Sequence, residues 1–199
     1  MIKEVSIKCK ADLEKFYKSI PLYKSLFYKN ITFKMDKDKY DIQSIITALN
    51  IKNRKKRITY IYDEACRKID NHYKNRNICG FKNNKCYVQQ KLNNGNINGC
   101  CRYCLYQSSV GCKTSNLTCK LFTCSEVEKR CKTVKYEEIK ILKLLNYRQR
   151  LIAKTNYFTK RETFINDLYI NSFVLWELKQ LIRLIYTFIK IRSKKTLFK

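Results

Sequence analysis

The chain has 199 residues, of which 43 are lysine or arginine, 16 are aspartate or glutamate and one is histidine, so its formal net charge is +27. A hydrophobic share of 45% argues against intrinsic disorder, and one proline with four glycines argues against a turn-rich β fold. So large a positive charge weakens a compact state unless a polyanion binds it, and nucleic acid is the commonest such partner. A Lys- and Asn-rich coding bias is the alternative, although it does not account for so few carboxylates.

The first segment, residues 1–76, is predicted to be mostly helical. Its N-terminus has no uninterrupted apolar run, so a secretory signal is not expected and the chain is placed in the reducing cytoplasm. A short helix is expected around residues 42–49. The aromatic and β-branched stretch over residues 23–33 is expected to be either a strand or an irregular segment.

The strongest predicted helix runs from about Lys56 to Tyr73. It is predicted from apolar residues that recur at spacings of three and four, namely Ile58, Ile61, Tyr62, Ala65, Cys66 and Ile69. The basic run before this helix is unfavourable for the helix dipole, so an anion such as phosphate is expected there. A solvated basic linker is the alternative. The residues predicted to contact phosphate here are Lys52, Arg54, Lys55, Lys56 and Arg57.

The second segment, residues 77–132, contains nine of the eleven cysteines and all four glycines. The predicted metal ligands are Cys79, Cys86, Cys100, Cys101, Cys104, Cys112, Cys119, Cys124 and Cys131. Their spacing reads C-x6-C-x13-C-C-x2-C-x7-C-x6-C-x4-C-x6-C, in which the C-x2-C and C-x4-C pairs are typical of zinc sites. The segment is therefore predicted to be an irregular metal-binding module.

Three accounts of these cysteines stay open. In the first, eight thiolates bind two Zn²⁺ ions as tetrahedral sites. In the second, four of them hold a 4Fe–4S cluster, although the spacing matches neither the bacterial nor the plant ferredoxin pattern. In the third, they form disulfides in an exported protein. His72 precedes the module and could be an additional ligand, or could contact the end of its own helix.

The third segment, residues 133–199, is predicted to be an αα-hairpin. Thr133 is expected to cap a helix that runs to about Tyr157. A capping box over residues 159–162 is expected to open a second helix that ends near Ile191. Charged residues interrupt the apolar stretch of this second helix, so no transmembrane segment is predicted. The fold class is therefore mainly α, with N-terminal helices and a long C-terminal αα-hairpin flanking the cysteine-rich module.

The apolar stripe of the last helix is wider than a coiled-coil seam. Such breadth indicates burial on two sides, either against the rest of one monomer or in a homodimer. With its basic residues, the helix could also support an assembly or a membrane-surface role.

No motif indicates catalysis. The single histidine is not accompanied by a nucleophile motif, and the sequence has no glycine-rich phosphate loop. The predicted function is therefore non-enzymatic binding of RNA or DNA. Arg102 and Tyr103, between two predicted ligands, are expected to contact the nucleic acid. A redox or sensor protein with an iron–sulfur cluster is the alternative.

Overall fold

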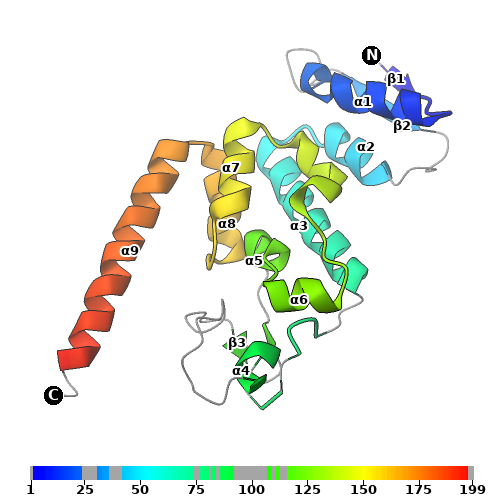
Figure 1. Ribbon diagram of the computed structural model, residues 1–199. Coiled ribbons are helices and arrows are strands. Elements are labelled where there is room, and N and C mark those ends of the chain that lie inside the picture. The colour runs from blue at the N-terminus through cyan, green and yellow to red at the C-terminus, as the bar shows by residue number, and fades with distance from the viewer. Residues whose placement is uncertain are drawn as a thin grey trace.

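The computed structural model describes residues 2–23, 31–35, 42–73, 77–80, 82–83, 86–91, 107–108, 111–112 and 116–196. The fold is mainly helical, as predicted (Figure 1). In chain order, its elements are β1 (Ile2–Val5), α1 (Lys10–Tyr23), β2 (Thr32–Met35), α2 (Gln43–Asn50), α3 (Arg54–Tyr73), α4 (Tyr87–Lys91), β3 (Gln107–Ser108), β4 (Gly111–Cys112), α5 (Leu117–Leu121), α6 (Ser125–Arg130), the 3₁₀ helices η2 (Tyr136–Glu138) and η3 (Lys140–Leu144), α7 (Tyr147–Thr155), α8 (Arg161–Ile170) and α9 (Phe173–Thr196).

The N-terminal part joins a small parallel strand pair to the helices. Strand β1 pairs with β2, with Ile2 opposite Thr32, and α1 connects them. The side chain of Asn50, at the end of α2, accepts from the backbone N–H of Phe33 at 2.8 Å and donates to its carbonyl at 2.9 Å. Asn50 thereby satisfies both backbone groups of a strand residue, which fixes β2 against α2.

Helix α3 is the central helix of Figure 1 and confirms the strongest sequence prediction. The predicted stripe is inside: Ile58, Ile61, Tyr62, Ala65 and Ile69 are buried, and Cys66 is partly buried. The helix begins at Arg54, slightly earlier than predicted, because the Asn53 side chain accepts from the backbone N–H of Lys56 at 2.9 Å. A protein side chain therefore caps this helix start.

The first half of the predicted C-terminal hairpin is wrong in detail. In place of one helix from Thr133, the chain forms η2, η3 and then the short helix α7. The reason is a capping box in the middle of the stretch. Asn146 accepts from the backbone N–H of Gln149 at 2.9 Å, and Gln149 accepts from that of Asn146 at 3.0 Å. Such a pair starts a new helix, so the preceding turns end before it.

The second half of the hairpin is two helices. The expected capping box at residues 159–162 is wrong, because no side chain caps the first residue of α8 and Thr159 Oγ1 instead accepts from the Asn116 amide at 3.1 Å. Helix α8 ends at Asn171, which has φ 57° and ψ 27°. A left-handed residue stops a helix, and asparagine tolerates that conformation better than most residues. The last helix, α9, starts two residues later.

The hydrophobic core is one cluster that extends from the strand pair through α2 and α3 to α7 and α8. Its largest fully buried side chains include Phe33, Tyr62 and Phe164, and the rings of Tyr62 and Phe164 lie 4.9 Å apart. Among the described side chains, helix α9 joins this core through Phe173 and the buried Trp176 in its first turns, and the rest of the helix projects from the body (Figure 1). Among the described residues, none of the helices is long and apolar enough to cross a membrane.

Candidate functional site

Most of the clustered cysteines fall in described parts of the chain, namely Cys79, Cys86, Cys112, Cys119, Cys124 and Cys131. The other predicted ligands, Cys100, Cys101 and Cys104, lie outside the described residues, as do Arg102 and Tyr103, two of the predicted nucleic-acid contacts.

Cys79 and Cys86 are brought together by a reversal of the chain around Gly80. The backbone N–H of Tyr87 donates to the Cys79 carbonyl at 2.9 Å, and the Gln90 amide donates to the Gly80 carbonyl at 2.8 Å. Gly80 has φ +59°, and a Cβ at this position would lie 3.2 Å from Cβ of Tyr87. Glycine therefore allows both the left-handed backbone and the close approach of the two chain segments.

Helix α6 carries a cysteine at each end, with Cys124 at its N-cap and Cys131 at its C-cap. Between them, Arg130 links α6 to the reversal around Gly80. Its guanidinium lies 4.0 Å from the centre of the Tyr87 ring and donates to the Ile78 carbonyl at 3.5 Å. These contacts dock the end of α6 against the segment that carries the first two cysteines.

Tyr73, the last residue of α3, lies beside both segments. Its hydroxyl accepts from the backbone N–H of Val134 at 3.0 Å. Burial raises the pKa of Tyr73 and the hydrogen bond from Val134 opposes that rise, whereas negative charge on Cys131, Glu138 or Cys79 would raise the pKa further. Tyr73 is therefore within electrostatic range of two cysteines that are distant in the sequence.

Cys119 lies in α5, a short helix that is firmly attached to the body. The Asn116 side chain accepts from the backbone N–H of Cys119 at 2.9 Å, and the Thr118 hydroxyl donates to the Ala153 carbonyl at 2.8 Å. The Cys119 sulfur accepts from the backbone N–H of Phe158 at 3.4 Å. This hydrogen bond holds the Cys119 sulfur against the turn that follows α7.

Among the described residues, no group of three or more His, Cys, Asp or Glu side chains could hold a metal ion. A zinc site of this type needs four ligands, and three candidate ligands lie outside this part of the chain. The metal site therefore stays a prediction. His72 contacts the backbone: its Nε2 lies 3.1 Å from the carbonyl oxygen of Lys132.

The basic run before α3 divides into two groups. Three of its members donate to backbone carbonyls: Lys52 to Ile31 at 2.5 Å, Arg54 to Tyr169 at 2.9 Å, and Arg57 to Ile51 at 2.9 Å. Ile51 is the C-cap of α2, and Tyr169 is in the last turn of α8. These two arginines therefore serve the negative ends of neighbouring helices, which explains their place at the start of α3.

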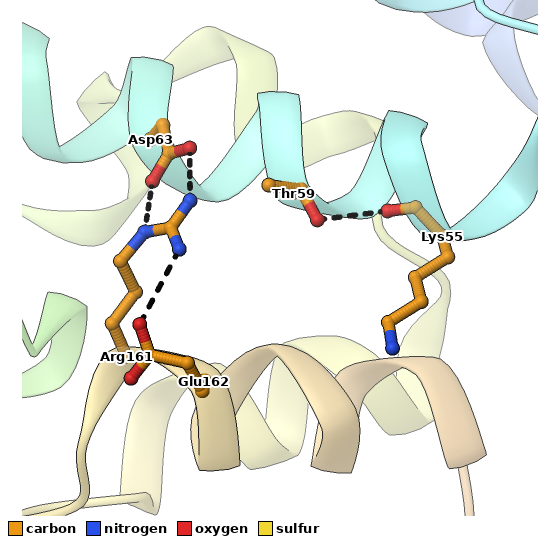
Figure 2. A network of polar contacts seen from close by, with 5 residues as sticks. All are labelled: Lys55, Thr59, Asp63, Arg161 and Glu162. Atoms are coloured by element: carbon orange, nitrogen blue, oxygen red, sulfur yellow. Dashed lines mark hydrogen bonds and ion pairs between the residues drawn. The ribbon is translucent and has the colours of Figure 1, made fainter.

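Lys55 and Lys56 form the second group. Both are exposed, and their ammonium groups make no hydrogen bond or ion pair with any described residue. Figure 2 shows Lys55 extending from α3 toward α8. The two lysines line a hollow of about 740 Å³ beside α3, together with Asp63, Glu64 and other residues.

Both carboxylates in this hollow are already neutralised. Arg161, at the start of α8, donates to the two oxygens of Asp63 at 2.7 and 2.5 Å (Figure 2). Arg67 donates to the two oxygens of Glu64 at 2.7 and 2.6 Å. These paired contacts leave the lysines as the source of net charge in the hollow.

A second hollow, of about 480 Å³, lies further along α3. It is lined by Arg67, Lys68, Asn71, His72, Val134, Glu138, Ile139 and Lys140. Arg67 belongs to both hollows, so they adjoin along one helix. We call the four lysines of the two hollows, Lys55, Lys56, Lys68 and Lys140, the α3 basic stripe.

Sequence reasoning missed Lys68 and Lys140. Each stands without a basic cluster to mark it, and Lys140 comes from the 3₁₀ segment η3. Lys68 follows Lys56 by 12 residues, about 3.3 helical turns, so helical periodicity did not place the two lysines on one face of α3. The contribution of Lys140 depends on the packing of η3 against α3, which the sequence pattern did not predict.

Cys66 is a packed thiol on the apolar stripe of α3. Burial raises its pKa to about 12. A thiol with so high a pKa is protonated at neutral pH and is a poor nucleophile and metal ligand. It is therefore separate from the cysteines of the module.

Comparison with known proteins found no matching family model, no match among curated proteins and no matching solved structure.

Proposed function

We propose that the chain is a non-enzymatic cytoplasmic protein that binds nucleic acid through the α3 basic stripe, and that its cysteine-rich segment folds around zinc. The arrangement of lysines in two adjoining hollows carries the proposal. Hollows of this size admit phosphate groups, and Lys55 and Lys56 have no described anionic partner.

The overall charge supports the same proposal. If each of the 16 carboxylates neutralised one of the 43 lysines and arginines, 27 cations would still be unmatched within the chain. Phosphate groups along a nucleic acid would match them, with release of bound counterions as the driving force.

For the metal, we propose that Cys79 and Cys86, whose chain segments meet at the reversal around Gly80, belong to one site. Its other ligands would be further cysteines of the module, including those outside the described residues, and a second zinc would use the remaining thiols. A Zn²⁺ ion with four thiolates carries a charge of −2, so each site would also reduce the positive charge of the chain.

Two further functions stay as alternatives. A 4Fe–4S redox or sensor protein would use the same cysteines. An assembly or membrane-surface role is favoured by one observation, the exposed apolar face of α9.

The test begins with elemental analysis of protein purified without air and without added metal. About two zinc ions per chain in a colourless solution support the proposal, whereas iron with absorbance near about 400 nm supports the cluster alternative. Binding to single-stranded and duplex oligonucleotides is then measured at several salt concentrations. Affinity that does not fall as salt rises would contradict phosphate recognition. Removal of zinc with a chelator should lower the melting temperature.

A further inference from the structure

Helix α9 is amphipathic, but its polar side chains face the body and its apolar side chains face solvent, the opposite of a typical surface helix. Its polar side faces the body: the Lys179 ammonium donates to Asp167 at 2.6 Å, and the Arg183 guanidinium donates to the carbonyls of Tyr157 and Phe158 at 3.1 and 2.5 Å. Its apolar side faces solvent. The residues at least half exposed there are Val174, Leu175, Leu178, Leu181, Ile182, Leu184, Ile185, Tyr186 and Ile189.

The exposed face is too large for an isolated soluble surface. Nine large apolar residues that are each at least half exposed present on the order of 1,000 Å². The largest apolar patch of a typical monomer is about 300–600 Å², and a stable protein interface buries about 800 Å² per partner. The area therefore matches what one copy contributes to a dimer.

We infer that α9 pairs with α9 of a second copy of this chain in antiparallel orientation. The helix has 24 residues, and at about 1.5 Å per residue it is about 36 Å long. Glu177 is the only acidic residue in its sequence, and Lys190, Arg192, Lys194 and Lys195 are all in its last seven residues. Apart from Lys179 and Arg183, which face the body, the acidic and basic residues thus occupy opposite ends of the helix.

This distribution selects the antiparallel orientation. Parallel pairing would place eight cations side by side at one end. Antiparallel pairing separates the two basic ends by more than about 20 Å, which exceeds the Debye length of about 8 Å at physiological salt. With the antiparallel helices fully overlapped, position 177 of each copy lies opposite position 192 of the other. Within one helix, position 195 is 18 residues, or five turns, after position 177, so both lie on the same side of the helix.

Glu177 also distinguishes a second copy from a lipid surface. It lies on the same side of α9 as Leu181 and Leu184, four and seven residues further along. An apolar face that enters a membrane would take this carboxylate with it, which is costly. In the dimer, the position opposite it on the partner helix is 192, which is basic in the sequence.

The test is the mass of the full chain in solution, measured by sedimentation velocity from about 1 to about 100 µM. We expect 48 kDa, twice the chain mass of 24.0 kDa. The double variant Leu181→Glu/Ile185→Glu should be monomeric. The matched control Leu22→Glu, which alters an apolar residue that is 61% exposed on α1, should stay dimeric.

Orientation is tested by charge exchange. Glu177→Lys should weaken the dimer about tenfold, since two symmetric ion pairs of about 0.7 kcal/mol are lost. Adding Arg192→Glu and Lys195→Glu should restore it, an outcome that parallel helices cannot give.

A wild-type chain that is monomeric at about 100 µM overturns the inference, as does a monomer that floats with phosphatidylserine vesicles. Oligonucleotide binding by the monomeric double variant is measured separately, so failure of the dimer and failure of nucleic-acid binding are distinguishable.

Discussion

The sharpest prediction separates two kinds of basic residue in one short run. The double variant Lys55→Gln/Lys56→Gln removes two ammonium groups from the first hollow, where the two neighbouring carboxylates are held by arginines. It should weaken nucleic-acid binding while leaving the free energy of unfolding nearly unchanged. The matched variant Arg54→Gln/Arg57→Gln removes the same charge, but from cations that donate to backbone carbonyls.

The expected magnitudes follow from these contacts. Each phosphate contact contributes a slope of about −0.7 to −0.9 to a plot of log K against log salt, or about sixfold in affinity at 0.1 M salt. Loss of two lysine contacts should therefore reduce the slope by about 1.6 and the affinity by about 40-fold. The arginine variant should keep most of the slope and lose about 2–4 kcal/mol of stability, because two hydrogen bonds from charged donors are removed.

Fluorescence anisotropy with a labelled oligonucleotide at several KCl concentrations gives the slope, and urea denaturation gives the free energy of unfolding. The reasoning is refuted if the two double variants lose the same slope, because net charge alone would then explain binding. It is also refuted if the lysine variant is the one that is destabilised.

Three further predictions concern stability and reactivity. Gly80→Ala should cost about 1–2 kcal/mol and lower the zinc content, because alanine is strained at φ +59°; thermal melting and elemental analysis check this. Phe164→Ala should cost about 3–5 kcal/mol in urea denaturation, since the ring is fully buried against Tyr62. Burial raises the pKa of Cys66 to about 12, so its contribution to stability is complete below the unfolded pKa of about 8.5 and is lost as pH rises toward 12. At about pH 8, iodoacetamide should therefore modify Cys66 far more slowly than the exposed Cys9, as peptide mass spectrometry can show.

Sequence reasoning succeeded where one local pattern decided the structure. The apolar spacing of α3 predicted both the helix and its buried face, because a continuous helix needs no information from distant residues. It failed where a continuous apolar pattern competed with a polar residue that ends or starts a helix. The capping box of Asn146 and Gln149 and the left-handed Asn171 each divide a stretch whose apolar pattern reads as continuous. Single polar residues within an apolar pattern therefore set the helix boundaries, and an analysis of apolar spacing alone does not detect them.

Most residues of the candidate site could be predicted from the sequence, but their positions and contacts in the fold could not. The basic run before α3 was found, yet sequence could not show that Arg54 and Arg57 donate to neighbouring helix ends, because those carbonyls belong to other elements. Lys140 reaches the α3 basic stripe only through tertiary packing. For the cysteines, the spacing indicated ligands, whereas the position of Cys131 relative to the reversal around Gly80 depends on how α6 docks.

The left-handed conformation of Asn171 has a consequence for how the molecule would engage a long polyanion. Asn171 helps to set the angle at which α9 leaves α8, and in the proposed dimer that angle would fix the span between the two bodies. Two lysine surfaces held at a constant span can grip one strand at two points, and such bivalent attachment strengthens binding without any new contact. A change of backbone angle at residue 171 would alter that span, and with it the length of nucleic acid that both surfaces can bind at once.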